Sequence, residues 1–357
     1  MCLTGRIRSI IDQVLPGQPE VRGVDHEPLI AECLASIDLM MAISFLIDEN
    51  HEAKTMKAMT RRQFGVMCAA GMAGMVTSGT ARAQQSSRMV ELPQGGSAPA
   101  LGMGSWHLAQ GRHPVAEEEN ALRTGLSLGM TLIDTAEMYG SGASEEMIGR
   151  VIAGQREKVF LVSKVLPSHA TRAEDIRRAC AGSLARLKTH NMDLYLLHWR
   201  GGVHRLDVVV DTFEALRAEG KIRRWGVSNF GVRDMDELFG VDGGRACATN
   251  QVPYSLIDRS IERDLVPWSV RNGVPLMAYS PLGTGNSGLL RNPTLAQVAA
   301  RRGVTSAAVA IAWTMRNGRT IAIPESGSAD HIRENAAALG LVLDKQDLAQ
   351  LDRAFPA

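Results

Sequence analysis

Eight short apolar segments alternate with amphipathic helical segments along most of this chain. The apolar segments begin near Leu101, Thr131, Val159, Met192, Arg223, Ala248, Pro275 and Thr320. Apolar residues at helical spacing lie between them, for example in residues 117–128, 172–189 and 208–218. Such alternation predicts a parallel sheet, and eight units predict closure into a (β/α)8 TIM barrel. Functional side chains are then expected at the C-terminal ends of the strands.

Polar residues stand at three of these strand ends. The second, third and fourth predicted strands end in Asp134, Lys164 and His198, and Tyr139 follows Asp134 on a turn-like segment. A phenol is a poor acid at neutral pH because its unperturbed pKa is about 10. A neighbouring lysine would lower that pKa and an aspartate would hold the lysine, so the pattern predicts Tyr139 as a proton donor.

These four residues resemble the catalytic tetrad of the aldo-keto reductases, which are NAD(P)H-dependent carbonyl reductases on a (β/α)8 barrel. The resemblance covers roughly residues 90–357. It implies that Asp134, Tyr139, Lys164 and His198 are catalytic, that His198 orients the carbonyl, and that aldehydes or ketones are reduced to alcohols. The implied cofactor is NADP(H), with NAD(H) as the alternative. The motifs Leu-Ile-Asp-Thr-Ala-Glu-Met-Tyr, Leu-Leu-His-Trp and Ala-Thr-Asn-Gln-Val look most similar to those of bacterial reductases of small aldehydes such as methylglyoxal.

Further motifs of the resemblance imply where the nicotinamide and the substrate bind. Gly104 and Ser105, at the end of the first strand, are expected beside the nicotinamide, and Trp106 is expected to line the substrate pocket. The Gly-x-Ser-Asn and Asn-Gln motifs are expected to bind the carboxamide through Ser228, Asn229 and Gln251. After the seventh strand, the expected aromatic platform and pyrophosphate contacts are Tyr279, Ser280 and Leu282. The glycine-rich segment 283–288 is expected to be a loop that can close over the cofactor.

The eighth strand departs from the family pattern. The family has Ile-Pro-Lys-Ser and then Arg-x-x-Glu-Asn, whereas Glu325 and His331 stand here for the lysine and arginine that hold the 2′-phosphate of NADP. A carboxylate repels a phosphate, so we expect a weakened preference for NADP, with Glu325 accepting hydrogen bonds from a ribose hydroxyl. Ser326, His331 and the next helix N-terminus are still expected to bind phosphate, and Asn335 to reach the adenine.

Two structural segments flank the predicted barrel. Residues 90–99 contain Pro-Gln-Gly-Gly and predict a β-hairpin, which in the family plugs the barrel floor. Residues 344–355 predict a terminal helix packed through Leu348, Leu351 and Phe355.

The N-terminal residues carry a different pattern. Residues 1–55 have no clear organisation; they are either a translated extension or upstream DNA read as protein, because Met56 offers a second start. Residues 56–83 hold Arg61-Arg62, an apolar run and Ala81-Arg82-Ala83, which predicts a twin-arginine signal cleaved before Gln84. The alternative is an ordinary amphipathic helix. We expect a barrel domain of residues 84–357, with the twin-arginine translocase as a partner and the periplasm as location; the cytoplasm is the alternative.

Charge, hydropathy and cysteine spacing limit the other functions and partners that this chain could have. The formal net charge of +1 provides no long-range field for nucleic acid, and the apolar run of the signal is too short for a stable membrane span. The five cysteines form no CxxC pair or zinc spacing, so we expect no metal. An alternative function is a nucleotide-binding regulatory barrel, similar to the β-subunits of potassium channels, with little turnover. A barrel isomerase or lyase would need metal ligands or a phosphate cup, and the sequence shows neither.

Overall fold

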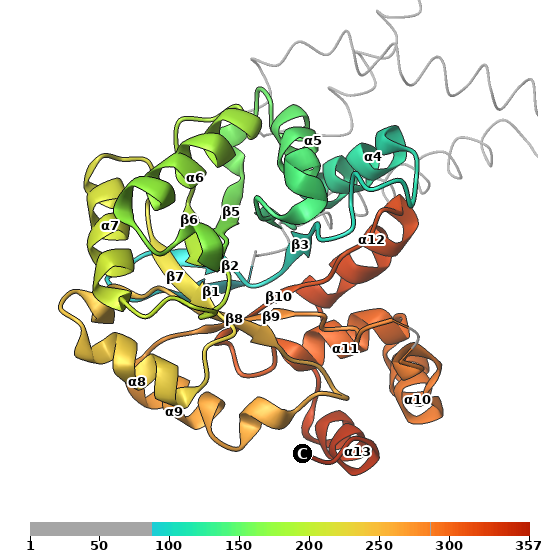
Figure 1. The fold of residues 1–357 in the computed structure, drawn as a ribbon. Coiled ribbons are helices and arrows are strands. Elements are labelled where there is room, and N and C mark those ends of the chain that lie inside the picture. The colour runs from blue at the N-terminus through green and yellow to red at the C-terminus, as the bar shows by residue number, and fades with distance from the viewer. Residues whose placement is uncertain (1–87, 286) are drawn as a thin grey trace, which may run out of the picture. The chain divides into compact units, whose positions relative to one another are not determined.

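The computed structural model describes residues 88–285 and 287–357, which contain a barrel of eight parallel strands (Figure 1). The barrel strands are β3 (Gly102–Gly104), β4 (Leu132–Asp134), β5 (Phe160–Val165), β6 (Leu194–Leu197), β7 (Trp225–Ser228), β8 (Asn250–Pro253), β9 (Leu276–Tyr279) and β10 (Thr320–Ile323). Each strand pairs in parallel with the next one along the chain. Bridges from Leu101 to Ala322 and from Gly104 to Glu325 join the last strand to the first. The predicted barrel is confirmed, and each strand starts at most two residues after its predicted start, as Leu194 does against Met192.

Helices surround the strands on the outside of the barrel (Figure 1). They are α4 (Val115–Ser127), α5 (Ala143–Val151), α6 (Ala173–Arg186), α7 (Leu206–Ala218), α8 (Val232–Gly240), α9 (Leu265–Asn272), α10 (Pro293–Arg302), α11 (Ser306–Thr314), α12 (Ala329–Ala336) and α13 (Lys345–Ala354). Two helices, α10 and α11, follow β9 where simple alternation predicts one. The predicted terminal helix is α13, whose N-terminus is capped by Asp344. No helix in this described part of the chain is long and apolar enough to cross a membrane.

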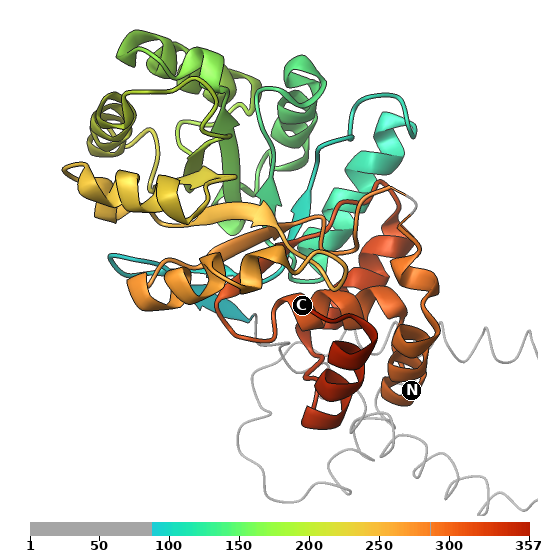
Figure 2. The same ribbon diagram turned by 60° about the horizontal axis from the view of Figure 1, so that its bottom comes forward.

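A hairpin closes the end of the barrel opposite the predicted site. Its strands β1 (Met89–Glu91) and β2 (Ser97–Pro99) pair antiparallel, and Val90 and Ala98 are buried in the core. Arg224, which directly precedes β7, donates from its guanidinium to the carbonyl oxygen of Gly95 at 2.7 Å. The hairpin therefore lies at the N-terminal ends of the strands, as the sequence predicts (Figure 2).

The helix layer packs closely enough to restrict side-chain size. A Cβ added at Gly149 of α5 would lie 2.7 Å from the carbonyl oxygen of Arg186, at the end of α6. This oxygen belongs to the backbone and cannot turn away as a side chain could. The close approach of α5 and α6 therefore depends on the missing side chain at residue 149.

We predict that Gly149→Ala lowers the free energy of unfolding by about 1–3 kcal/mol because it overpacks this helix contact. Urea denaturation of the two proteins measures the difference. The matched control is Gly240→Ala in α8, where an added Cβ has no heavy atom within 4 Å. We expect that control to be neutral or slightly stabilising, and an equal loss in both variants would contradict the packing argument.

Candidate active site

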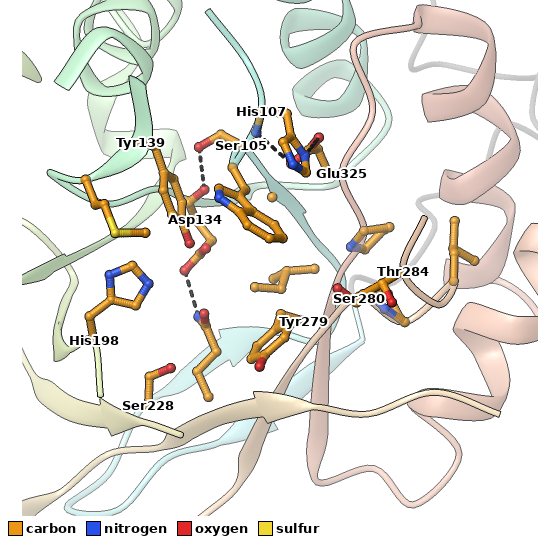
Figure 3. Close-up of a pocket in the computed structure, with 18 of the residues that line it drawn as sticks. Ser105, His107, Asp134, Tyr139, His198, Ser228, Tyr279, Ser280, Thr284 and Glu325 are labelled. Atoms are coloured by element: carbon orange, nitrogen blue, oxygen red, sulfur yellow. Dashed lines mark hydrogen bonds and ion pairs between the residues drawn. The ribbon is translucent and has the colours of Figure 1, made fainter. Parts of the chain in front are cut away.

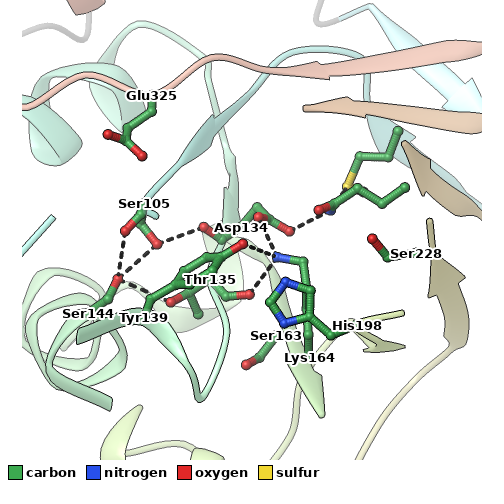
Figure 4. A network of polar contacts seen from close by, with 12 residues as sticks. Ser105, Asp134, Thr135, Tyr139, Ser144, Ser163, Lys164, His198, Ser228 and Glu325 are labelled. Carbon is green, nitrogen blue, oxygen red and sulfur yellow. Dashed lines mark hydrogen bonds and ion pairs between the residues drawn. The ribbon is translucent and has the colours of Figure 1, made fainter. Parts of the chain in front are cut away.

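Lys164 is the centre of a buried polar cluster at the C-terminal ends of β4 and β5 (Figure 4). Its side chain is fully buried, and its Nζ donates to Asp134 Oδ2 at 2.7 Å, to the carbonyl oxygen of Thr135 at 2.9 Å and to Tyr139 Oη at 3.1 Å. An ammonium group has three protons and no acceptor, so these three bonds use its full capacity. The structure thus brings three of the four predicted catalytic residues into one hydrogen-bonded group.

Tyr139 begins a short 3-10 turn, Tyr139–Gly142, in the loop that follows β4. Because Lys164 can only donate, the phenol oxygen accepts the hydrogen bond between them. Among the described residues, none accepts a hydrogen bond from the Tyr139 hydroxyl. The phenol proton is therefore left for a group outside the protein.

Asp134 connects this cluster to a third strand. Its Oδ1 accepts from Gln251 Nε2 at 2.7 Å, while its Oδ2 holds Lys164. The same amide nitrogen of Gln251 lies 2.9 Å from the sulfur of Met277 on β9. Gln251 is a predicted carboxamide contact, and its nitrogen is engaged within the protein; no described residue donates to its Oε1.

The pKa of Tyr139 differs from the sequence-based expectation. Burial raises the pKa of the phenol and the positive charge of Lys164 lowers it, with the net result above the ordinary value of about 10. The prediction of a net lowering is therefore wrong for the protein alone, because removal from water outweighs the lysine. Burial disfavours the charge of Lys164 as well, but Asp134 and Tyr139 outweigh it and hold the lysine pKa above its ordinary value. Lys164 thus remains an ammonium group.

His198 follows β6, and its backbone N–H donates to the carbonyl oxygen of Val165 at 3.0 Å. Its ring meets that of Tyr139 edge to face, with 5.7 Å between centroids. Burial, followed by the charge of Lys164, lowers the pKa of His198 to about 3. The imidazole is therefore neutral at physiological pH, and its buried Nδ1 has no partner in the structure. It can offer one N–H donor to a ligand.

A cavity of about 450 Å³ opens above this cluster. Figure 3 shows Tyr139, His198 and Tyr279 around the same space. The predicted site residues that line it are Gly104, Ser105, Trp106, Asp134, Tyr139, His198, Ser228, Asn229, Gln251, Tyr279, Ser280, Leu282 and Glu325. Lys164 does not line the cavity, but it contacts Asp134 and Tyr139, which do. Ser326, His331 and Asn335 do not line the cavity: Asn335 is buried on α12 and His331 is exposed. Their expected contacts with phosphate and adenine remain predictions.

Asn229 ties three strand ends together at the wall of this cavity. Its Nδ2 donates to the carbonyl oxygen of His198 at 3.1 Å and to Ser228 Oγ at 3.0 Å, and its Oδ1 accepts from Tyr279 Oη at 2.9 Å. Its φ of +58° is one that asparagine tolerates. These bonds hold the Tyr279 ring as a flat surface on the cavity, which fits the aromatic platform that the resemblance implies for a nicotinamide. The hydroxyl of Ser228 and Oε1 of Gln251 offer the donor and acceptor that a carboxamide needs.

Ser105 has a role that the sequence did not predict. Its Oγ donates to the carbonyl oxygen of Asp134 at 2.8 Å and accepts from Ser144 Oγ at 2.8 Å, while Thr135 Oγ1 also donates to Ser144 (Figure 4). This buried network joins β3, β4 and the start of α5. Thr135 and Ser144 were not identified from the sequence. Both are polar residues close to a predicted catalytic strand end, and that position could have pointed to them.

Glu325 contacts the loop after β3. Its Oε2 accepts from the backbone N–H of His107 at 3.0 Å, and its Oε1 lies 2.9 Å from His107 Nδ1 (Figure 3). Nearby, Ser328 caps the N-terminus of α12 by accepting from the backbone N–H of His331, and it donates its own N–H to Ser326 Oγ at 3.1 Å. His107 thus engages both carboxylate oxygens of Glu325. His107 was missed, although it directly follows the predicted Trp106.

A closed barrel with a tyrosine, a lysine, an aspartate and a histidine around a strand-end cavity has the features implied by the aldo-keto reductase resemblance. The model of the family described as "Aldo/keto reductase family" matches residues 100–355, and the chain belongs to this family.

Individual proteins of known sequence and structure are also similar to this chain. The chain is 45% identical over 273 residues to the methylglyoxal reductase YeaE of Escherichia coli K12, covering 76% of this chain and 95% of that protein. It is 32% identical to a glyoxal reductase of Bacillus subtilis, covering 74% of this chain and 91% of that protein. An aldo/keto reductase from Klebsiella pneumoniae, solved in complex with NADP and acetate, is 46% identical with a TM-score of 0.72, covering 75% of this chain and 95% of that one.

The depressed pKa of His198 predicts a pH dependence of stability. Between about pH 6.5, the ordinary value, and about pH 3, the unfolded chain binds one more proton at this residue than the folded chain. Stability is therefore lost as the pH falls through this window. We expect the contribution to reach about 3 kcal/mol between pH 7 and pH 4.

Urea denaturation at several pH values measures this effect, with His198→Gln as the comparison. The difference between the two proteins isolates His198 from the carboxylates that also titrate in this range. Parallel curves of stability against pH for the two proteins would contradict a buried neutral imidazole.

Proposed function

We propose that this chain catalyses the NADPH-dependent reduction of aldehydes and ketones to alcohols, with small 2-oxoaldehydes such as methylglyoxal as preferred substrates. The observation that carries the proposal is the hydrogen bond from Lys164 Nζ to Tyr139 Oη. It turns the phenol proton away from the lysine, at a residue that lines the cavity. Family membership and relatives solved with NADP or NADPH support the reaction class and the cofactor.

The reduced nicotinamide, when bound, supplies the hydride. Tyr139 gives its proton to the carbonyl oxygen, and Lys164 then faces a phenolate, which an ammonium group stabilises. Asp134 keeps the lysine charged and in place. His198, being neutral, donates a hydrogen bond to the carbonyl oxygen and orients it toward Tyr139. Tyr279, Ser228 and Gln251, which line the cavity, would hold the nicotinamide and its carboxamide.

The preference for small aldehydes is supported by the cavity and by the relatives. Trp106, Met138 and Trp199 contribute apolar lining beside Tyr139 and His198. Two of these relatives are named methylglyoxal reductase and glyoxal reductase, and the similarity spans 95% and 91% of their lengths. A weakened preference for NADPH over NADH, expected from Glu325, remains a prediction.

We predict that Tyr139→Phe lowers kcat for methylglyoxal by about 10²–10⁴-fold, since general acid catalysis contributes on that order. Loss of nicotinamide absorbance with NADPH measures turnover, and fluorescence titration measures cofactor affinity, which should change by less than about twofold. Wild-type turnover that Tyr139→Phe retains would remove the tyrosine from the mechanism. Cofactor binding without turnover in the wild type would favour a regulatory nucleotide-binding barrel.

We further propose that residues 56–83 act as a twin-arginine signal and that the barrel is exported to the periplasm. These residues, and residues 1–55, lie outside the described part of the structure. The support is the Arg61-Arg62 pair, the apolar run and the Ala-Arg-Ala site in the sequence.

We expect replacement of Arg61 and Arg62 by lysine to abolish export of the full chain in a bacterial host, measured by cell fractionation. N-terminal sequencing of the exported wild type should begin at Gln84. Equal periplasmic amounts of wild type and variant would contradict the proposal, and a cytoplasmic wild type would favour the alternative location.

A further inference from the structure

Glu325 lies where the barrel closes on itself. It lies two residues after the end of β10 at Ile323, and its backbone forms a parallel bridge with Gly104 of β3. Across this seam, the carboxylate contacts the β3–α4 loop and accepts the backbone N–H of His107 at 3.0 Å. Its second oxygen lies 2.9 Å from the ring Nδ1 of the same histidine. The carboxylate thus fixes both the backbone and the ring of His107.

The His107 ring in turn supports the wall of the cavity. It stacks on the indole of Trp106, with 4.4 Å between ring centroids and 27° between planes. Trp106 lines the cavity and is 49% exposed, so few other atoms hold its side chain. Its indole N–H makes no hydrogen bond with any described residue. The stack on His107 is therefore the contact that the structure offers to select one orientation of this side chain.

A second carboxylate fixes the same loop two residues further along the chain. Glu118 of α4 is fully buried, and its Oε2 accepts the backbone N–H of Ala109 at 2.6 Å. The loop backbone is thus held at residues 107 and 109. Of the two carboxylates, only Glu325 also contacts a ring that touches the indole, so it alone acts on the side-chain orientation of Trp106.

We propose that Glu325 is a positioning residue for the substrate wall: through His107 it sets the orientation of Trp106 and thereby the fit of bulky, flat carbonyl substrates. The inference rests on the proposed function, because it concerns the substrate side of the same cavity. This role takes the place of the ribose contact expected for Glu325 from the sequence, because both carboxylate oxygens already engage His107. A small aldehyde touches less of this wall and depends on it less.

Steady-state kinetics with saturating NADPH test the proposal on Glu325→Ala. We expect KM for 4-nitrobenzaldehyde to rise about tenfold, which corresponds to about 1.4 kcal/mol of lost binding. KM for methylglyoxal should change by less than about twofold. The dissociation constant of NADPH should not rise, because the variant removes a carboxylate that is expected to oppose the 2′-phosphate. Glu325→Gln keeps an acceptor for the His107 backbone N–H, so it should rescue most of the effect. The matched control is Asp330→Ala, which removes an exposed carboxylate from the same segment without touching the β3–α4 loop.

A double-mutant comparison identifies the route of the effect. In a Trp106→Ala background, Glu325→Ala should raise KM for 4-nitrobenzaldehyde no further, because the indole on which it acts is gone. A tenfold rise that persists in that background would overturn the proposal. So would a weakened dissociation constant of NADPH with an unchanged KM for the aryl aldehyde, since Glu325 would then act on the cofactor.

A structural readout separates this inference from the proposed function. The near-ultraviolet circular dichroism of Trp106, taken as the difference between wild type and Trp106→Ala, should change on Glu325→Ala and on His107→Ala. The chain has five tryptophans, so the difference is needed to isolate one. If the wild type reduced neither aldehyde, the proposed function would fail while this readout still decided the positioning role. An unchanged Trp106 signal in both variants would overturn it.

Discussion

The buried ion pair between Lys164 and Asp134 is the interaction on which the rest of the site depends. Removing an ammonium and a carboxylate from water costs several kcal/mol for each ion, and only close contacts with full hydrogen bonding offset that cost. The 2.7 Å contact and the two further bonds from Lys164 supply them. The pair requires β4 and β5 to be neighbours, with both side chains directed to the same end of the barrel. Pairing of β4 with β5 therefore also assembles the centre of the site.

Hydrogen bonds continue from this pair around the rim of the barrel. Asp134 reaches β8 through Gln251, and its backbone carbonyl anchors Ser105 after β3. Asn229 joins the ends of β6, β7 and β9 in the same way. Residues that the family resemblance assigns to cofactor binding thus also hold the strand ends together. A substitution at Gln251 or Asn229 is expected to affect both stability and binding, so kinetic changes there do not identify a role by themselves.

The strands and the catalytic cluster could be predicted because their signals are local. An apolar run that ends in a polar residue is visible in the sequence, and the barrel rule places such ends together. The bond between His107 and Glu325 could not be predicted in this way, since these residues are 218 positions apart and meet only where the barrel closes. The predicted direction of the pKa shift of Tyr139 was wrong for a related reason. The sequence shows the lysine that lowers the pKa, but the extent of burial that raises it depends on the packed structure.

The proposed function depends on one directional hydrogen bond inside a buried cluster. Lys164 has no acceptor, so its contact with Tyr139 determines which way the phenol proton points. The apolar wall with Trp106 and the platform of Tyr279 then decide what can approach that proton. Under the proposed function, the first feature determines the reaction and the second selects the substrate.

The most direct test of this account is a double-mutant cycle on kcat for methylglyoxal with Lys164→Met and Tyr139→Phe, each checked for folding by circular dichroism. If the lysine acts through the phenol, each single variant loses most of the activity and the double variant is no slower than Tyr139→Phe alone. Losses that multiply in the double variant would contradict the account, because the two residues would then contribute independently.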